Sequence, residues 1–421
     1  MKSVKFYTLG CKVNQYDTQE IRERFLEAGL REAAGSARAD ICVVNTCTVT
    51  AKADKESLYH IHRAHRENPG AKIVVTGCLV EQDRALVKRQ AGVKFIVPNR
   101  EKAGLAACVL KKRVVSGTGI SSFAGHARAF LKVQDGCNNF CSYCKVPLVR
   151  GRSRSRLLDE ITVEARQLAA NGFKEIVLTG ICLGAFGRDL RPKRSLVDVI
   201  AALETIPGLV RIRLSSIEAG DVSAALIKKM AASEKLCRHL HIPIQSGDDT
   251  ILNKMHRSYT RSDYLGLIAG IKKHIPGIGL TTDVLVGFPG ETGRQFANTV
   301  GLIKAIEPLR CHVFGFSPRP GTAAFDLNGA LPPAVIRQRA ALVRRVAEDC
   351  GRRFRTQSLG TREAVLLEGR CQDDPAFWEG YTAAYIKVRV RSRKDLTNSL
   401  VRVRLAAACR DYLLGTVLRY G

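Results

Sequence analysis

The sequence predicts an α/β protein in three parts: an N-terminal open parallel sheet, a central set of six βα alternations and a small all-β C-terminal domain. Apolar strand patterns alternate with amphipathic helical patterns from Lys2 to about Phe316, which predicts the two parallel parts. A change to short alternating strands after Thr361 predicts the third part. We place the domains at residues 1–118, 126–357 and 358–421.

Three strand patterns in the N-terminal part are each followed, within two residues, by a cysteine. The patterns are Lys2–Leu9, Asp40–Thr46 and Lys72–Thr76, and the cysteines are Cys11, Cys47 and Cys78. The cysteines are 36 and 31 residues apart, which is close to the length of one βαβ unit. Because parallel sheets gather ligands at the carboxyl ends of their strands, these thiols predict a metal site. The alternative is three separate core cysteines without a ligand role.

The helix after the first strand has a predicted start and end. Asp17 and Glu20 form an N-cap and N3 pair, which predicts that the helix begins there. Ile21 and Phe25 give it an apolar face, and Gly29 is a typical stop.

The central part follows a connector rich in glycine and serine near residues 116–125. Its six strand patterns are Phe130–Gln134, Glu175–Gly180, Val210–Ser215, His239–Gln245, Gly279–Val286 and Cys311–Phe316. Helical patterns separate them, as at Leu157–Ala170 and Glu291–Ile306. Continuous βα alternation predicts a parallel sheet that is either open or curled toward a barrel.

The connection after the first central strand carries a C-x3-C-x2-C array of Cys137, Cys141 and Cys144. Three thiolates can hold three irons of a 4Fe–4S cluster and leave the fourth iron without a protein ligand. Such an open iron can bind and cleave a small molecule. The alternative is a zinc site, which requires four ligands in a closed tetrahedron. The closest candidate for a fourth ligand is His126, eleven residues before the array.

Polar residues alternate with apolar ones along two central strands, which predicts a polar interior face. The polar sets are Arg211, Arg213 and Ser215 on one strand, and His239, His241 and Gln245 on another. A network of satisfied structural hydrogen bonds is the alternative use of these residues. Ser215, Gln245 and Asp283 lie toward strand ends and are candidate cofactor contacts, and Gly180 allows a ligand to approach the backbone closely.

The charge balance predicts a polyanionic partner, because 67 basic and 39 acidic side chains leave a net charge of +28. Arg150, Arg152, Arg154 and Arg156 follow the cysteine array and are candidate RNA contacts, as are Lys387, Arg389 and Arg391 in the C-terminal part. Trp378, Tyr381 and Tyr385 lie near the second group, a mixture typical of backbone contact with base stacking. A charged edge strand that resists aggregation is the alternative.

The sequence predicts a cytosolic protein that does not contact a membrane. It has no apolar run of about 18 residues, and its N-terminus lacks a signal-peptide core. In a reducing cytosol the 14 cysteines are better explained as ligands and buried side chains than as disulfides.

The chain resembles the radical S-adenosylmethionine (SAM) methylthiotransferases over nearly its whole length and in the same domain order. The resemblance is carried by T-L-G-C-K-V-N-Q-Y-D-T, N-T-C-T-V-T, D-G-C-N-N-F-C-S-Y-C, R-G-R-S-R-S-R, H-I-P-I-Q-S-G, V-L-V-G-F-P-G-E-T and S-P-R-P-G-T. It implies an N-terminal methylthiotransferase domain, a partial (β/α)6 barrel of the radical SAM type and a C-terminal TRAM domain with an OB-like barrel. One departure is Cys182, where related sequences commonly carry asparagine.

The resemblance also implies two 4Fe–4S clusters. One cluster is held by Cys137, Cys141 and Cys144, and it cleaves SAM to a radical that takes hydrogen from adenine C2. The other cluster is held by Cys11, Cys47 and Cys78. It carries the sulfur, which a second SAM methylates. Tyr143 and Gly180 join Ser215, Gln245 and Asp283 as expected SAM contacts. The implied partners are the anticodon arm of tRNA, an electron donor such as flavodoxin or ferredoxin, and a sulfur donor.

Within this family, K-V-N-Q-Y-D-T after Cys11 is similar to the branch that converts N6-threonylcarbamoyladenosine next to the anticodon to its 2-methylthio derivative. The alternatives are methylthiotransferases that act on isopentenyladenosine in tRNA or on a ribosomal protein. An alternative from another class is a zinc-dependent RNA-binding protein without catalytic activity.

Overall fold

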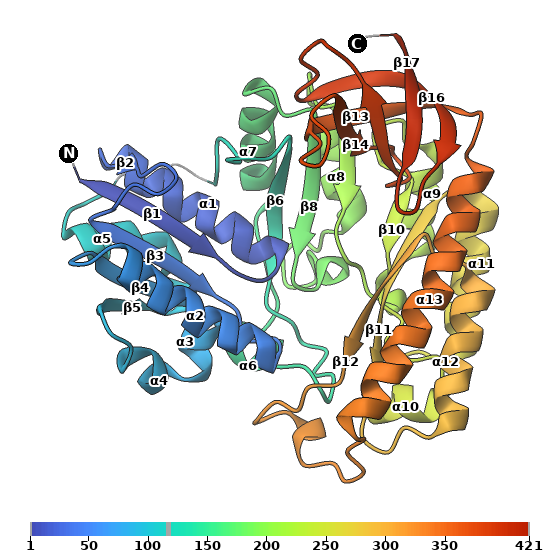
Figure 1. The fold of residues 1–421 in the computed structure, drawn as a ribbon, viewed down its shortest axis with the longest axis horizontal. Helices are drawn as coiled ribbons and strands as arrows, with labels where there is room; N and C mark the ends of the chain where they lie inside the picture. Colours follow the sequence, from blue (N-terminus) through green and yellow to red (C-terminus); the bar gives the residue numbers. More distant parts are fainter. Residues whose placement is uncertain (1, 115–118, 420–421) are drawn as a thin grey trace.

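The computed structural model describes residues 2–114 and 119–419 of the chain (Figure 1). The predicted domain boundary at residue 118, and the start of the connector at residues 116–118, lie outside the described residues. Among the described residues, no helix is both long enough and apolar enough to cross a bilayer.

The N-terminal part is an open sheet of five parallel strands in the order β2-β1-β3-β4-β5, as predicted. The strands are β1 (Ser3–Thr8), β2 (Arg31–Glu32), β3 (Ile41–Thr46), β4 (Lys72–Gly77) and β5 (Val93–Val97). Its helices are α1 (Lys12–Glu27), α2 (Ala51–Glu67), α3 (Cys78–Gln82), α4 (Arg84–Lys88) and α5 (Leu105–Leu110), with a 3-10 turn η1 (Asn99–Gly104). Neighbouring residues of β3 enter separate cores on the two faces, Val43 with Phe25 and Val44 with Ile61.

The predicted start of the first helix is wrong. Helix α1 begins at Lys12, with Cys11 as its N-cap, and Asp17 lies inside it. Asp17 does not cap the helix because its buried carboxylate binds the ammonium groups of Lys102 and Lys132. The helix ends at Glu27, two residues before Gly29.

The central part is a partial barrel of six parallel strands, which confirms the curled form of the predicted sheet. The strands are β6 (Arg128–Asp135), β8 (Glu175–Gly180), β9 (Arg211–Leu214), β10 (His239–His241), β11 (Gly279–Val286) and β12 (Arg310–Gly315). Parallel bridges from Ile212 to Leu236 and from Ser216 to His241 connect its two halves, and β7 (Arg154–Ser155) pairs antiparallel with β6. β10 is shorter than predicted, since Pro243 cannot donate to a strand ladder.

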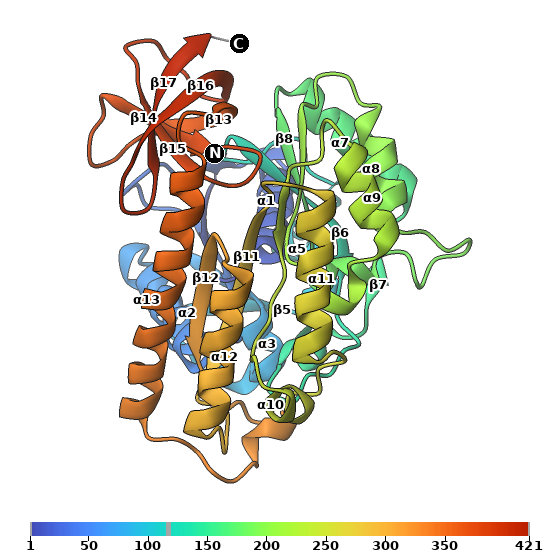
Figure 2. The same cartoon turned by 90° about the vertical axis from the view of Figure 1, so that its right-hand side faces the viewer.

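Helices cover the outer face of the barrel strands (Figure 2). The longer helices are α7 (Leu158–Ala170), α8 (Leu196–Glu204), α9 (Ala224–Ala232), α11 (Arg261–His274) and α12 (Gly293–Ile306). Short turns of helix lie in the connections: α6 (Val146–Arg150), η2 (Leu183–Ala185), η3 (Ala219–Asp221), α10 (Asp249–Lys254) and η4 (Ala323–Phe325). The largest apolar core of the protein lies between these helices and the strands.

The long helix α13 (Pro333–Gln357) leads to a closed five-stranded barrel, which confirms the predicted small all-β domain. Its strands are β13 (Arg362–Arg370), β14 (Phe377–Tyr381), β15 (Lys387–Arg391), β16 (Ser399–Ala408) and β17 (Leu413–Arg419), in the order β13-β14-β15-β17-β16. The barrel lies at the amino ends of the central strands (Figure 1). At Gly279 an added Cβ would be 1.9 Å from the carbonyl oxygen of Ala384, so only glycine permits this close docking.

Candidate functional site

Cys11, Cys47 and Cys78 lie at the carboxyl ends of three neighbouring strands. Cys11 caps α1 after β1, Cys47 follows β3, and Cys78 begins α3 after β4. Since β1, β3 and β4 are adjacent and parallel, their carboxyl ends share one edge of the sheet. At Gly10 an added Cβ would be 2.9 Å from the Cys47 Sγ, and the backbone φ is +91°, so a side chain there would displace Cys47. The structure thus brings these cysteines to one edge of the sheet, as the sequence predicts.

Without a metal, the thiols of Cys11 and Cys47 favour the protonated form at neutral pH. Burial raises the pKa of Cys47 to about 11, and burial also raises the pKa of Cys11. Cys78 adds repulsion to the thiolate form of both. A metal deprotonates a coordinating thiol outright, so a bound metal centre would relieve this penalty.

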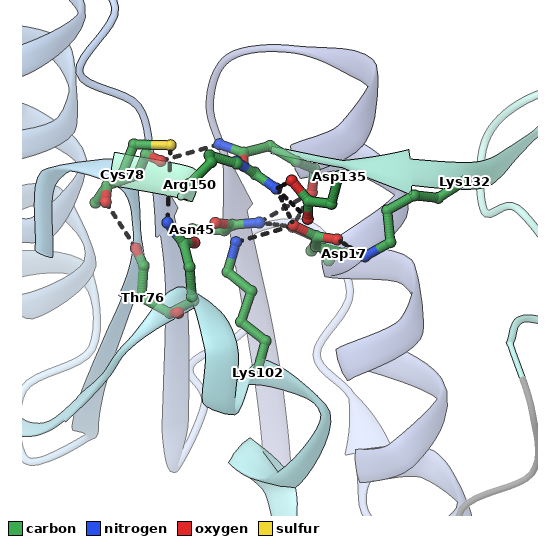
Figure 3. Close-up of polar contacts among 12 residues, drawn as sticks. Asp17, Asn45, Thr76, Cys78, Lys102, Lys132, Asp135 and Arg150 are labelled. Atoms are coloured by element: carbon green, nitrogen blue, oxygen red, sulfur yellow. Dashed lines mark hydrogen bonds and ion pairs between the residues drawn. The ribbon is translucent and has the colours of Figure 1, made fainter. Parts of the chain in front are cut away.

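A buried network of charged side chains lies beside these cysteines (Figure 3). Asp17 binds Lys102 Nζ at 3.0 Å, Lys132 Nζ at 2.5 Å and Arg150 Nη1 at 3.2 Å, and Asp135 binds Arg150 Nη1 at 2.9 Å. The five residues hold three positive charges against two carboxylates. Because buried charge requires compensation, this excess fits an anionic group at the neighbouring cysteines. Three thiolates around an iron–sulfur core form such an anion.

One of the four arginines predicted to contact RNA is buried, which corrects the prediction for Arg150. The Arg150 side chain is 2% exposed and is held by Asp17 and Asp135. Its guanidinium cannot reach an RNA phosphate, because carboxylates engage it inside the protein. Arg156 is partly buried, with its side chain 19% exposed, and donates to Glu164 at 2.6 Å, and its contact with RNA stays a prediction. Arg152 and Arg154 are exposed and stay predicted RNA contacts.

Cys137, Cys141 and Cys144 lie in the loop that follows β6. Backbone bonds fold the loop tightly: Cys137 N donates to Gly151 O at 3.1 Å, and Cys144 N donates to Cys141 O at 2.9 Å. A hydrogen bond from Cys182 lowers the pKa of Cys137 to about 7, whereas burial raises the pKa of Cys144 to about 12. A hydrogen-bond donor, Cys182, therefore already lies against the sulfur of Cys137. Sulfurs that bind a cluster as thiolates require such donors.

Arg257 and Glu218 belong to this site although the sequence analysis did not identify them. Arg257 Nη1 donates to Cys141 Sγ at 3.3 Å, and its Nη2 forms an ion pair with Glu218. They line a cavity of about 300 Å³ together with Asn139, Cys141 and Asp221. The volume is at the lower end of the range for small-molecule sites. Neither residue lies in a cysteine-bearing motif, so only the tertiary structure reveals them.

Cys182 contacts the same loop. Its Sγ accepts from Asn139 Nδ2 at 3.7 Å and lies 3.7 Å from Asp221 Oδ2. Its hydrogen bond to Cys137 raises the pKa of Cys182, which therefore stays a thiol.

The five predicted SAM contacts differ in whether other side chains already occupy their polar groups. Ser215 Oγ is buried and has no hydrogen-bond partner in the described part of the chain, so it fits a polar ligand. Asp283 is occupied, because His241 Nε2 and His312 Nδ1 each lie 3.2 Å from its oxygens. Gln245 follows β10 with a φ of +59°, which places it in a strained backbone conformation.

The remaining two predicted SAM contacts, Tyr143 and Gly180, flank the cysteine loop. Tyr143 packs on a small apolar cluster with Met255 and Phe288. At Gly180 an added Cβ would be 2.9 Å from Gln134 Oε1, so its lack of a side chain serves packing. These contacts with SAM stay predictions.

The predicted aromatic platform for RNA in the C-terminal barrel is used for packing. Trp378 is 3% exposed in the barrel core, and the Tyr385 ring lies 4.6 Å from the His239 ring of the central part. Lys387 and Arg389 form ion pairs with Glu379 at 2.9 and 3.3 Å. Arg391 is exposed. RNA contact by these three basic residues stays a prediction.

Two family models match the chain: the uncharacterized protein family UPF0004 over residues 3–98 and the radical SAM superfamily over residues 131–303. Threonylcarbamoyladenosine tRNA methylthiotransferase MtaB of Bacillus subtilis is 35% identical, covering 100% of this chain and 97% of the relative. The protein of the same name from Chlamydia pneumoniae is 36% identical, covering 98% of each. A tRNA-2-methylthio-N(6)-dimethylallyladenosine synthase from Moorella thermoacetica is 33% identical, covering 99% and 98%.

Among solved structures, the fold resembles the radical SAM methyltransferase TsrM from Kitasatospora setae. The TM-score is 0.55 at 16% identity, covering 89% of this chain and 81% of that chain. The cobalamin-dependent radical SAM enzyme OxsB gives a TM-score of 0.52 at 12% identity, covering 77% and 54%. These similarities support the fold assignment of the sheet and partial barrel.

Proposed function

The chain belongs to the radical SAM methylthiotransferase family, and we propose that it converts N6-threonylcarbamoyladenosine next to the anticodon of tRNA to its 2-methylthio derivative. The observation that carries this proposal is 35% identity, over the whole chain, to a relative named for that reaction. The two cysteine sets support it, since each combines three thiols with polar groups suited to a metal cluster. The net charge of +28 suits a tRNA substrate.

We assign a 4Fe–4S cluster to Cys137, Cys141 and Cys144, and a second to Cys11, Cys47 and Cys78. When bound, the clusters and SAM supply one-electron chemistry on an unactivated C–H bond and the methyl group of the product. Arg257 donates to the sulfur of Cys141 and is itself oriented by Glu218. Ser215 offers a free buried hydroxyl to the bound SAM. In the net reaction, a C–H bond at adenine C2 is replaced by a C–S bond.

We propose further partners on the same basis. The reaction requires an electron donor such as flavodoxin or ferredoxin and a source of sulfur, and the tRNA places the reaction in the cytoplasm. Exposed Arg152, Arg154 and Arg391 are the proposed phosphate contacts.

The test is an anaerobic reaction of the iron-reconstituted protein with SAM, dithionite, sulfide and an anticodon stem-loop that contains threonylcarbamoyladenosine. Mass spectrometry of the digested nucleosides should show the 2-methylthio derivative, and Cys47→Ser and Cys141→Ser should each abolish it. Iron and sulfide analysis should give about eight irons per chain for two clusters and about four for each variant. Zinc without sulfide would support the RNA-binding alternative.

Dimethylallyladenosine is the second candidate substrate, because relatives named for its methylthiolation are up to 33% identical over nearly the whole chain. The same reaction with a stem-loop that contains dimethylallyladenosine separates the two. Product from this RNA alone would assign the chain to the second reaction. No product from either RNA would contradict both assignments.

A further inference from the structure

Arg150 connects the two cysteine sets. It is the last residue of α6, six residues after Cys144, and its charge interacts with Cys78 and Cys11. Figure 3 shows the Arg150 side chain between Cys78 and Asp135, with its guanidinium toward the carboxylates. Asn99 holds this arrangement, since its Nδ2 donates to Val149 O at 2.8 Å and lies 4.0 Å from Cys78 Sγ. The arginine therefore approaches the first cysteine set from the domain that carries the second.

One nitrogen of the Arg150 guanidinium, Nε, has no hydrogen-bond partner among the described residues. Its Nη1 binds Asp135 at 2.9 Å and Asp17 at 3.2 Å, and its Nη2 donates to Asn14 Oδ1. The Nε is buried. A buried N–H without an acceptor is costly, so this donor is suited to a group that binds at the site.

The charges around Arg150 do not balance. Asp17 is 2% exposed and Lys102 is 7% exposed, so solvent screens this pair little. With Lys132 and Asp135 included, the network retains one positive charge. Asp17 and Asn14 come from α1, whereas Asp135 ends β6, so docking of the two domains brings this charged network beside Cys11 and Cys78.

We propose that Arg150 is a positioning residue that stabilises an anionic iron–sulfur cluster at Cys11, Cys47 and Cys78. The inference rests on the proposed function, which assigns a cluster to these cysteines. The Nε–H of Arg150 donates toward a cluster sulfur, and the excess positive charge favours the reduced state, which carries one more electron. Both effects raise the reduction potential of this cluster relative to one in a neutral environment.

The test uses the full chain with Cys137, Cys141 and Cys144 changed to Ala, so that only the first cysteine set can hold a cluster. Arg150→Gln removes the charge, and Arg150→Lys keeps the charge while removing the Nε–H. The midpoint potential is measured by a redox titration followed by electron paramagnetic resonance, and iron release to a chelator is measured in parallel. Arg150→Gln should shift the potential to more negative values and release iron faster, with Arg150→Lys intermediate.

Arg156→Gln is the matched control. It removes a partly buried guanidinium of the same segment, which pairs with Glu164 and not with a cysteine. Circular dichroism of each variant checks that the fold is retained. An equal potential for Arg150→Gln and its parent, or an equal shift in Arg156→Gln, would overturn the role of Arg150 and leave the proposed function intact. A parent without iron would instead contradict the second cluster, and the inference with it.

Discussion

Arg213 Nε donates to Glu175 Oε1 over 2.7 Å in the core, and the same guanidinium donates to the carbonyl oxygens of Ala383 and Thr382 at 3.1 and 3.2 Å. Glu175 begins β8 and Arg213 lies on β9, so this buried ion pair attaches the C-terminal barrel to the amino ends of the central strands. The polar face predicted from strand alternation therefore serves here as a satisfied structural network.

We expect Arg213→Met to weaken this docking. Loss of one partner from a buried ion pair costs up to about 3–5 kcal/mol, and Arg211 and Arg128, which lie 3.6 and 3.8 Å from the Glu175 oxygens, reduce that cost here. The free energy of unfolding of the C-terminal barrel should therefore fall by less than about 3 kcal/mol. Trp378 is the sole tryptophan of the chain and lies in the barrel core, so its fluorescence during urea unfolding reports this domain. Arg391→Met, at an exposed site on β15, is the control, and equal midpoints for the two variants would contradict the prediction.

Acid should destabilise the protein through His239. Its side chain is buried, with its Nε2 3.0 Å from Thr281 Oγ1. Burial, followed by the charge of Arg213, lowers the pKa of His239 well below its usual value. The unfolded chain therefore binds a proton below about pH 6.5 that the folded protein does not bind. The stability is complete above that pH and falls, by about 1.4 kcal/mol per pH unit, as the pH drops toward the folded-state pKa.

Urea unfolding followed by far-ultraviolet circular dichroism, at about pH 7.5 and about pH 5.5, measures this effect. His239→Gln removes the titrating group and should flatten the pH dependence. His62→Gln is the control, because that histidine is exposed on α2 and bonds to Gln90. The same pH dependence in His239→Gln and in the unchanged protein would show that other groups cause the acid sensitivity.

Local patterns in the sequence predicted the strands that carry the cysteines. β1, β3 and β4 alternate with helices at regular spacing, so the sequence alone placed Cys11, Cys47 and Cys78 at one sheet edge. β2, with only two residues, and β5 were not predicted. A two-residue strand is too short to show alternation, and it exists only because β1 pairs with it.

Long-range polar contacts could not be predicted from patterns. Asp17 was predicted to cap a helix, yet its partners Lys102 and Lys132 lie 85 and 115 residues away. Arg150 looked like an exposed RNA contact because it stands in an arginine-rich segment, and only the tertiary structure shows the two carboxylates that bury it. A run of charged residues shows which side chains are present but not where they point. It therefore cannot distinguish an exposed surface from a buried network between domains.

Cys182 should not be a cluster ligand, despite its contact with Cys137. Its pKa is raised, and it donates to Cys137 where a ligand would bind metal as a thiolate. We therefore expect Cys182→Ser to keep the iron content of the reconstituted protein, whereas Cys137→Ser should lose about four irons. The cluster content of both variants is measured by iron analysis and by the absorbance of the sulfur-to-iron charge-transfer bands. Equal iron loss in the two variants would make Cys182 a ligand.

Arg152 and Arg154 should contribute to tRNA binding by neutralising phosphates. Both are exposed and follow the cysteine loop, unlike Arg150, which is buried. Removing one arginine that neutralises a phosphate should reduce the slope of log affinity against log salt by about 0.7–0.9, so the double change to Ala should reduce it by about 1.4–1.8. Fluorescence anisotropy with a labelled anticodon stem-loop at several salt concentrations measures the slope.

The control for this experiment is Arg352→Ala, which removes an exposed arginine from α13 that pairs only with Asp349 in the residues that the structure describes. Its slope should equal that of the unchanged protein, because a surface pair outside the RNA path releases no counterions on binding. If the double variant keeps the full slope while its affinity falls, the arginines act through the loop structure instead of through phosphate. An unchanged slope and affinity would place the RNA on another face of the protein.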